Sequence, residues 1–313
     1  MIKYFVKKLL TLIPILLGIT SLTFLLGLKA PGDPVEAILN PDGTQIVSKQ
    51  EYERVKEKLG LDQPFSVQYV KWLKNVMHGE FGQSFFTNKS IVEQIMYRFP
   101  FTLKLAMLGM VFTIVFGIGG GMIMASYQDS WRDHFLTFVS TLFLSIPGFW
   151  LAIMMILLFS EILHLLPSSG FHGFSSYIMP AITISISTIG VCARLTKTAI
   201  LDELGKLYVL VARAKGLARK KVIFRHAVRN SLIPITTFLG NYFAGVLGGS
   251  AIAEVIFNIP GLGSYAVSAV QSKDYLVVQA YVLISGMIYV AMTILIDLLY
   301  VMINPKLRVG EKR

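Results

Sequence analysis

Long apolar stretches separated by short charged blocks dominate the chain. Six of these stretches carry almost no Asp, Glu, Lys or Arg. A helix that crosses a bilayer needs about 20 predominantly apolar residues, and its backbone polar groups must bond within the helix. We therefore predict six transmembrane helices, at residues 9–28, 102–125, 135–160, 177–193, 232–253 and 276–303.

Small residues interrupt several of these stretches. The third contains the sequence Ser-Ile-Pro-Gly at residues 145–148, which we expect to lie within one long, tilted span. Glycines cluster in the second and fifth stretches, at Gly117, Gly119, Gly120, Gly121, Gly245, Gly248 and Gly249. Small residues allow close helix contact in lipid. Both ordinary close packing and a role in helix movement remain open for these glycines.

Lysine and arginine are distributed unevenly among the segments that join the predicted helices. The N-terminus, residues 194–229 and residues 305–313 hold 3, 10 and 4 of them, whereas residues 254–275 hold only Lys273. Cytoplasmic loops of membrane proteins are enriched in these residues when the loops are short. We therefore predict that both termini and the segment 194–229 are cytoplasmic.

The segment 29–99 then lies on the extracytoplasmic side and carries nine basic and nine acidic residues. Apolar positions recur at helical spacing over residues 45–60 and 65–78, and Gly60 suits the end of the first helix. A lid over the outer mouth and a docking surface for a partner that delivers substrate are compatible interpretations.

These predictions define the organisation of the chain. It comprises an N-terminal transmembrane helix (1–28), an extracytoplasmic insert (29–99), a five-helix core (100–303) with an inner loop (194–229), and a cytoplasmic tail (304–313).

Composition supports a membrane protein and excludes other classes. Of the 313 residues, 54% are hydrophobic and 15% are charged, whereas soluble domains carry about 25% charged residues. The net charge of +11 comes mainly from the predicted cytoplasmic segments, so we expect no nucleic-acid partner. The single cysteine, Cys192, cannot form an intrachain disulfide.

The sequence carries no recognisable catalytic centre. The phosphate-binding pattern Gly-x-x-x-x-Gly-Lys-Ser/Thr is absent, and the five histidines lack metal-ligand spacing. We predict no catalytic residue, no metal ligand and no cofactor bound by this chain. A secondary transporter or channel would place ionisable residues deep in its helices, where only Asp297 is a candidate, and Asp297 is more simply a helix-packing acid.

The basic inner loop contains an amphipathic pattern. Apolar residues recur at helical spacing at Leu207, Leu210, Val211, Ala214 and Leu217, and Gly216 breaks or bends that helix. From the pattern alone, the segment is either an interfacial helix on anionic lipid or a contact site for a partner protein.

Ordered motifs along the chain resemble one family. They are the segments 31–34, 59–64, 81–84, 145–150, 165–167, 208–217, 225–230, 254–263 and 304–308. Together they resemble the permease subunits of bacterial ATP-binding-cassette (ABC) importers, and more narrowly the B-type subunit of dipeptide, oligopeptide and nickel permeases. The inner loop has Val211-Ala212-Arg213 where the general importer pattern has Glu-Ala-Ala, a departure that suits the peptide and nickel branch.

The resemblance implies an all-α integral membrane protein of the type I ABC importer permease fold, with six transmembrane helices and an extracytoplasmic insert after the first. It implies multi-pass insertion in the bacterial cytoplasmic membrane. The implied partners are a second homologous permease, two cytoplasmic ATPase subunits that would hold ATP and Mg, and an extracytoplasmic substrate-binding protein.

The resemblance also assigns the inner loop to a coupling helix that docks on an ATPase subunit. The residues that it assigns to this contact are Leu207, Tyr208, Val211, Ala212, Arg213, Ala214, Lys215, Gly216, Leu217, Arg225, His226, Arg229 and Asn230. Family size favours short peptides (di- and oligopeptides) as substrate, and nickel or a nickel chelate is the alternative. No substrate-binding residue can be assigned.

Overall fold

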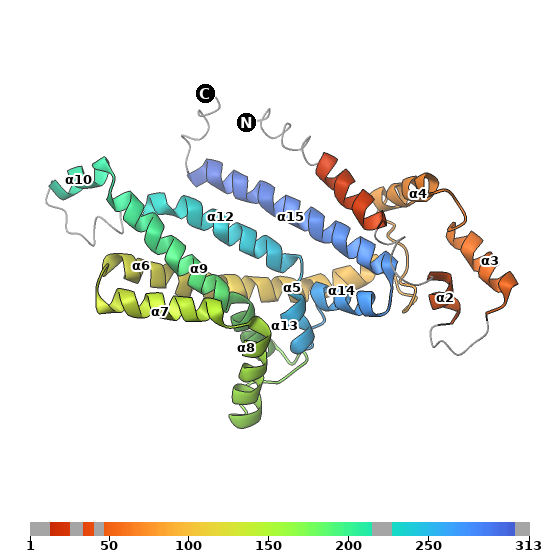
Figure 1. Cartoon of the computed structure of the whole chain (residues 1–313), viewed down its shortest axis with the longest axis horizontal. Helices are drawn as coiled ribbons and strands as arrows, with labels where there is room; N and C mark the ends of the chain where they lie inside the picture. Colours follow the sequence, from red (N-terminus) through yellow and green to blue (C-terminus); the bar gives the residue numbers. More distant parts are fainter. Residues whose placement is uncertain (1–12, 26–33, 41–46, 215–226, 304–313) are drawn as a thin grey trace, which may run out of the picture. The chain divides into compact units, whose positions relative to one another are not determined.

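The computed structural model describes residues 13–25, 34–40, 47–214 and 227–303. Within these residues every regular element is a helix, apart from one isolated bridge between Gln83 and Ser90. The all-α prediction is therefore confirmed for the described part of the chain (Figure 1).

The first helical segment, Ile13–Leu25, precedes a series of labelled helices. The α-helices are α2 (Pro34–Leu39), α3 (Lys49–Leu59), α4 (Phe65–Met77), α5 (Ile91–Phe112), α6 (Gly119–Ser126), α7 (Trp131–Ser145), α8 (Gly148–Met155), α9 (Ile178–Leu204), α10 (Leu207–Ala214), α12 (Val228–Leu247), α13 (Ala251–Ile256), α14 (Leu262–Gln271) and α15 (Tyr275–Ile303). Two π-helical segments, η1 (Thr113–Ile118) and η2 (Ile156–Ile162), and a 3-10 turn, η3 (Phe174–Tyr177), join them.

Three of the described helical stretches are long and apolar enough to cross a bilayer: Ile91–Ser126, Phe174–Leu204 and Tyr275–Ile296. The pair Trp131–Ser145 and Gly148–Ile162 gives a fourth if it is counted as one bent span. The first helical segment is apolar but shorter within the described residues. The count of six transmembrane helices stays a prediction.

The third predicted helix, 135–160, is wrong as a single tilted span. α7 ends at Ser145, α8 begins at Gly148, and the two stretches meet at 97° (Figure 1). Ile146 has an extended backbone, as the residue before a proline prefers, and Pro147 has no N–H for the helical ladder. The Ser-Ile-Pro-Gly sequence therefore separates two helices.

The fourth and fifth predicted helices also have different ends from those expected. α9 continues to Leu204, well into the predicted loop 194–229, because hydropathy reports residence in lipid and not helix length. α12 ends at Leu247, and Gly249 has a φ of +116°, a left-handed backbone that glycine adopts without steric cost. The chain resumes as α13 at Ala251, so the glycines here break the helix.

The chain divides into two compact units. Unit 1 comprises Met1–Phe101 and Pro260–Val290, and unit 2 comprises Thr102–Ile259 and Ala291–Arg313.

In unit 1, α4 packs along the first helical segment. The Phe24 ring lies 5.4 Å from that of Phe65 and 5.6 Å from that of Trp72, centroid to centroid. The Tyr69 hydroxyl lies 2.9 Å from the Thr20 hydroxyl. The apolar face of α4 that the periodicity predicted is thus the face that meets this segment.

A buried hydrogen bond fixes the turn after α4 to the start of α15, also within unit 1. The Ser84 hydroxyl donates to the Asp274 carboxylate at 2.6 Å, and both side chains are buried. The same carboxylate accepts from the Val277 N–H at 3.5 Å and so caps α15. Nearby, apolar side chains of α5, α14 and α15 form the core of the unit: Ile91, Ile95, Leu262, Tyr265, Ala269, Val277 and Ala280.

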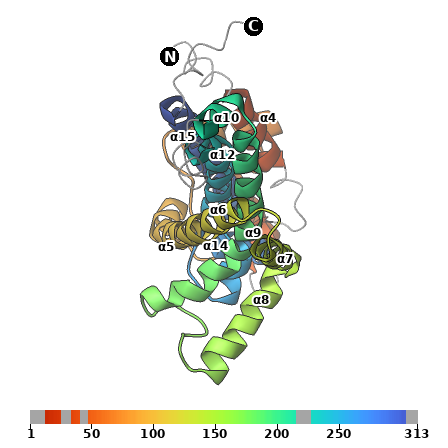
Figure 2. The ribbon, with the colours of Figure 1, turned by 90° about the vertical axis from the view of Figure 1, so that its left-hand side faces the viewer.

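In unit 2, α9 is the central helix. η1, α6, α7 and α12 pack against it (Figures 1 and 2). A Cβ atom on Gly117 would lie 2.8 Å from Cys192 Cβ, and one on Gly121 would lie 2.5 Å from the Ala193 carbonyl oxygen, so both glycines permit close contact with α9. The packing prediction is confirmed for these two, whereas a Cβ on Gly119 would meet none of the described neighbouring atoms within 4 Å.

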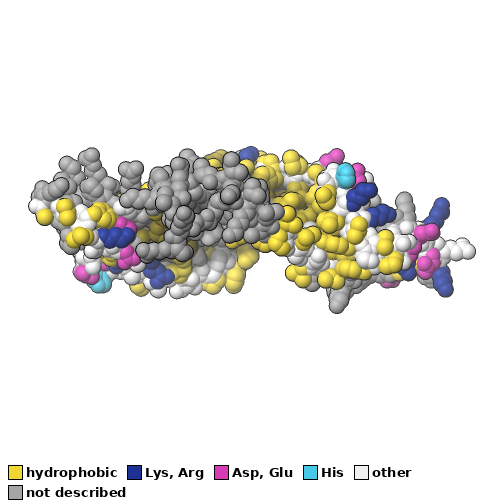
Figure 3. Space-filling model, turned by 90° about the horizontal axis from the view of Figure 1, so that it is seen from above, with side chains coloured by type: hydrophobic (Ala, Val, Ile, Leu, Met, Phe, Trp, Pro, Cys, Tyr) yellow, Lys and Arg dark blue, Asp and Glu magenta, His cyan; other side chains and the backbone are white. Residues whose placement is uncertain are grey.

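Apolar side chains cover much of the described surface. Figure 3 shows apolar side chains over much of the described surface in that view, with Lys, Arg, Asp and Glu side chains in small groups among them. On α7 the exposed residues Trp131, Phe135, Phe138 and Leu142 form one stripe at helical spacing. A continuous apolar exterior of this kind is expected of helices surrounded by lipid and not by water.

Candidate functional site

The structure describes part of the predicted coupling segment. α10 covers Leu207–Ala214, the first part of the helix that the periodicity indicated. Lys215, Gly216, Leu217, Arg225 and His226 lie outside the described residues, as do the side chains of Ala212, Arg213 and Arg229. The described members of the predicted contact set are therefore Leu207, Tyr208, Val211, Ala214 and Asn230.

A tight turn joins α9 to α10. α9 ends at Leu204, the Gly205 N–H donates to the Leu201 carbonyl at 3.2 Å, and the Val209 N–H donates to the Lys206 carbonyl at 3.0 Å. Only Gly205 and Lys206 separate the two helices. The position of α10 is consequently tied closely to the end of α9.

A small apolar cluster packs against the buried side of α10. Val209 is fully buried there. The cluster gathers residues of α6, of α9, of α10 and of the start of α12: Ala125, Ile200, Leu204, Val209 and Ala227. Among the described side chains of α10, Val209 is the one that packs into this cluster.

Polar side chains hold α10 at a second point. Glu203, near the end of α9, is 9% exposed and accepts a hydrogen bond from the Tyr208 hydroxyl at 2.5 Å. Asn230, on α12, donates from its amide to the same Tyr208 oxygen at 2.9 Å. Lys206 forms an ion pair with Glu203 from the turn. We call Glu203, Tyr208 and Asn230 the hinge cluster, because they join three helices at this turn.

The charge states in this region follow from the contacts. Burial and the hydrogen bond to Glu203 raise the pKa of Tyr208 above its ordinary value, so the phenol remains a donor at neutral pH. The hydrogen bond to Glu203 likewise raises the pKa of Lys206, which remains a cation.

The opposite face of α10 is open. Leu207 is 76% exposed and Val211, one turn later, is 49% exposed. Ala214 is also exposed on this helix. Apolar side chains at this spacing on a short helix suit contact with a partner protein, in the manner of a helix seated in a groove.

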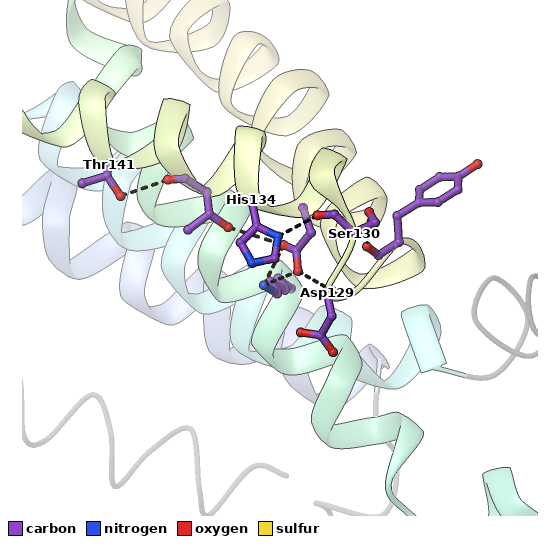
Figure 4. Close-up of polar contacts among 8 residues, drawn as sticks. Asp129, Ser130, His134 and Thr141 are labelled. Atoms are coloured by element: carbon purple, nitrogen blue, oxygen red, sulfur yellow. Dashed lines mark hydrogen bonds and ion pairs between the residues drawn. The ribbon is translucent and has the colours of Figure 1, made fainter.

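A second polar cluster lies at the start of α7. Asp133 is buried, and its carboxylate oxygens lie 2.7 and 2.9 Å from Lys197 Nζ on α9. The Asp129 N–H donates to Asp133 at 3.0 Å, and the His134 ring nitrogen lies 2.8 Å from the Ser130 carbonyl oxygen (Figure 4). This cluster fixes α7 to the same helix that carries Glu203.

Sequence reasoning missed three of these residues. Glu203 did leave a signal, since it is one of only two acids in the basic segment 194–229. Asp133 and Lys197 left none, because they are 64 positions apart and no local pattern pairs them.

Two protein-family models match the sequence. A model of the family described as "Binding-protein-dependent transport system inner membrane component" matches residues 117–309. A model of the N-terminal region of such components matches residues 1–106.

The chain is also similar to individual proteins. It is 36% identical over 308 residues to the glutathione transport system permease protein GsiC of Escherichia coli strain K12, covering 98% of this chain and 99% of that one. GsiC of Shigella flexneri serotype 5b has the same identity and coverage. A chain of the methionine ABC transporter MetNI, solved in an inward-facing conformation, aligns with a TM-score of 0.53 at 16% identity, over 66% of this chain and 96% of that one. This last similarity concerns the fold alone.

Proposed function

The chain belongs to the family of binding-protein-dependent transport system inner membrane components, and from this premise we propose that it forms half of the pathway of an importer of short peptides. As a permease subunit of an ABC importer, it works with ATPase subunits and a substrate-binding protein. A second, homologous permease would supply the other half of the pathway.

The open face of α10 is the observation that carries the proposed ATPase contact. Leu207 and Val211 are exposed on one side of the helix, while Val209 is buried on the other. A helix anchored on one face and apolar on the other suits insertion into a groove of a partner. We assign this face to an ATPase subunit and place it on the cytoplasmic side, where the excess of Lys and Arg in residues 194–229 also places it.

Conformational change would follow from this contact. Two ATPases that close on ATP would displace the two α10 helices of a permease pair. Because helices move as rigid bodies when packed, this displacement would turn the pathway from one side of the membrane to the other. ATP and Mg would be bound by the ATPase subunits, as the resemblance implies, and the phosphate-binding pattern is absent from the sequence of this chain.

The relatives support a peptide as substrate. GsiC is described as a glutathione transport system permease over a match that covers nearly the whole of both chains. Glutathione is a tripeptide, so the proposed substrate class is the short peptide. No observation on this chain favours nickel.

Uptake by cells tests the proposal. A strain that expresses this chain with its chromosomal neighbours is compared with one that lacks only this chain, using labelled glutathione, a labelled dipeptide and nickel in parallel. We expect peptide accumulation that depends on the chain, with nickel accumulation unchanged. Chain-dependent nickel uptake without peptide uptake would contradict the proposed substrate class.

A further inference from the structure

Tyr208 is 38% exposed, but its hydroxyl bonds within its own chain. The resemblance assigned this residue to the ATPase contact, yet its phenol oxygen is bonded to Glu203 on α9 and Asn230 on α12. Neither bond involves the open face of α10 formed by Leu207 and Val211. The role of Tyr208 therefore differs from that of its neighbours on the same helix.

We infer that the hinge cluster is a positioning device that makes α10 move as one body with α9 and α12. Through it, a displacement of α10 by an ATPase subunit reaches both helices. This inference rests on the proposed function, since it concerns how the energy of ATP reaches the pathway.

The geometry explains why such a device is needed. The described part of α10 has eight residues, too few to be stable as an isolated helix, so its orientation depends on its contacts. Within the described residues, a two-residue turn, the buried Val209 side chain and the Tyr208 hydroxyl hold the start of α10. The Tyr208 oxygen bonds to both α9 and α12, so it ties the start of α10 to two helices at once.

Breaking the hydrogen bond between Tyr208 and Glu203 costs free energy. Tyr208 donates to a carboxylate, and hydrogen bonds to charged groups are the stronger kind. Glu203 is nearly buried, so losing the phenol would leave its carboxylate poorly solvated. Lys206 contributes less to this arrangement, because its side chain is 55% exposed and water can replace it.

Glu203 also connects the hinge cluster to the centre of unit 2. It lies on α9, against which η1, α6, α7 and α12 pack. The Asp133–Lys197 ion pair fixes α7 to the same helix. A displacement of Tyr208 is therefore transmitted through Glu203 to α9, the helix against which these elements pack.

The test uses the complete complex, purified with its ATPase and permease partners and reconstituted in liposomes with the binding protein. Y208F removes one oxygen and keeps the ring. E203Q keeps an oxygen that accepts from the phenol, whereas E203L does not. K206M removes the exposed ion pair alone, and Y97F is a matched control, since Tyr97 is exposed on α5 and lies outside the hinge cluster. The measured quantity is the number of ATP molecules hydrolysed per labelled glutathione transported.

We expect Y208F and E203L to assemble, to hydrolyse ATP, and to raise this ratio by about tenfold, the change that corresponds to one hydrogen bond to a charged group. K206M and Y97F are expected to stay within about twofold of the wild type, because each keeps the bond from Tyr208 to the carboxylate. E203Q is expected to lie between these and Y208F, because its amide oxygen accepts a weaker, uncharged bond. A role in folding alone would lower the yield of the complex and leave the ratio unchanged. If the E203L complex does not assemble, the ratio measured for the Y208F complex tests the inference.

Different results would overturn the proposed function and the role of the hinge cluster. A wild-type chain that does not associate with the ATPase subunits would overturn the proposed function and this inference together. A wild-type complex that transports glutathione while Y208F keeps the wild-type ratio would overturn the inference alone.

Discussion

Adding one methyl group at Gly121 tests the packing of α6 against α9. A Cβ at this position would lie 2.5 Å from the Ala193 carbonyl oxygen and 2.5 Å from Thr196 Cβ. Carbon atoms in contact prefer about 3.5–4.0 Å, so α6 and α9 would have to separate by about 1 Å. Because one obstacle is backbone, rotation of a side chain cannot relieve the contact.

The size of the effect follows from two opposing terms. Overpacking of a well-packed site costs about 1–3 kcal/mol. Replacing glycine by alanine within a helix recovers about 0.5–1 kcal/mol. The 2.5 Å contact with backbone puts the cost of overpacking at the upper end of its range, so we expect G121A to lower stability by about 2–2.5 kcal/mol. This corresponds to a decrease in Tm of several degrees, at about 2–4 °C for each kcal/mol in a domain of 150–250 residues.

Gly119 provides a matched control on the same helix. A Cβ there would meet nothing within 4 Å, so G119A adds the same methyl group without the clash. Thermal unfolding of the two variants in detergent, followed by tryptophan fluorescence, should give shifts of opposite sign. Equal shifts, or a more stable G121A, would refute the close packing of α6 on α9.

Three further predictions concern other contacts. K197M should lower Tm by the equivalent of about 2–3 kcal/mol, below the full cost of breaking a buried pair because Lys197 is 24% exposed. D133N/K197M should lose less stability than D133N and K197M lose in sum, and an additive double variant would contradict the ion pair. S84A should lower the free energy of unfolding by about 1–3 kcal/mol, because it removes a donor from the buried Asp274 carboxylate. It should also speed amide hydrogen exchange over residues 81–90, and unchanged exchange would show that this bond does not hold the turn. Gly216→Leu should leave assembly intact and abolish transport, and normal transport would remove Gly216 from the coupling role that the sequence predicts for it.

Helix periodicity predicted the insert helices well. α3 and α4 form where apolar positions recur at helical spacing, and Gly60 ends α3 with a φ of +70°. Here local sequence decides the outcome, because amphipathic spacing and a glycine cap are short-range signals.

Hydropathy located the long helices but not their ends. α9 extends past the apolar run to Leu204, and the 97° bend at Pro147 was expected to be only an interruption. An apolar window reports which residues suit lipid, whereas the direction of the chain after a break depends on contacts distant in sequence.

The contacts within the candidate site were also not predictable from the local sequence. Tyr208 and Asn230 were selected from the inner-loop motif, but their bonds to each other and to Glu203 join residues 5 and 22 positions apart. A motif identifies which residues matter to a family and does not say whether a side chain meets a partner or its own chain. The structure assigns the hydroxyl of Tyr208 to its own chain and leaves Leu207 and Val211 open.

The central claim is that ATP hydrolysis by partner subunits drives transport through this chain. Uptake of labelled glutathione by proteoliposomes that contain the full complex tests it most directly, with ATP, with a non-hydrolysable analogue, and with an ion gradient in place of ATP. We expect accumulation only when ATP and the binding protein are both present, and none in vesicles that lack this chain. Accumulation driven by an ion gradient without ATP would contradict it and would identify a secondary transporter.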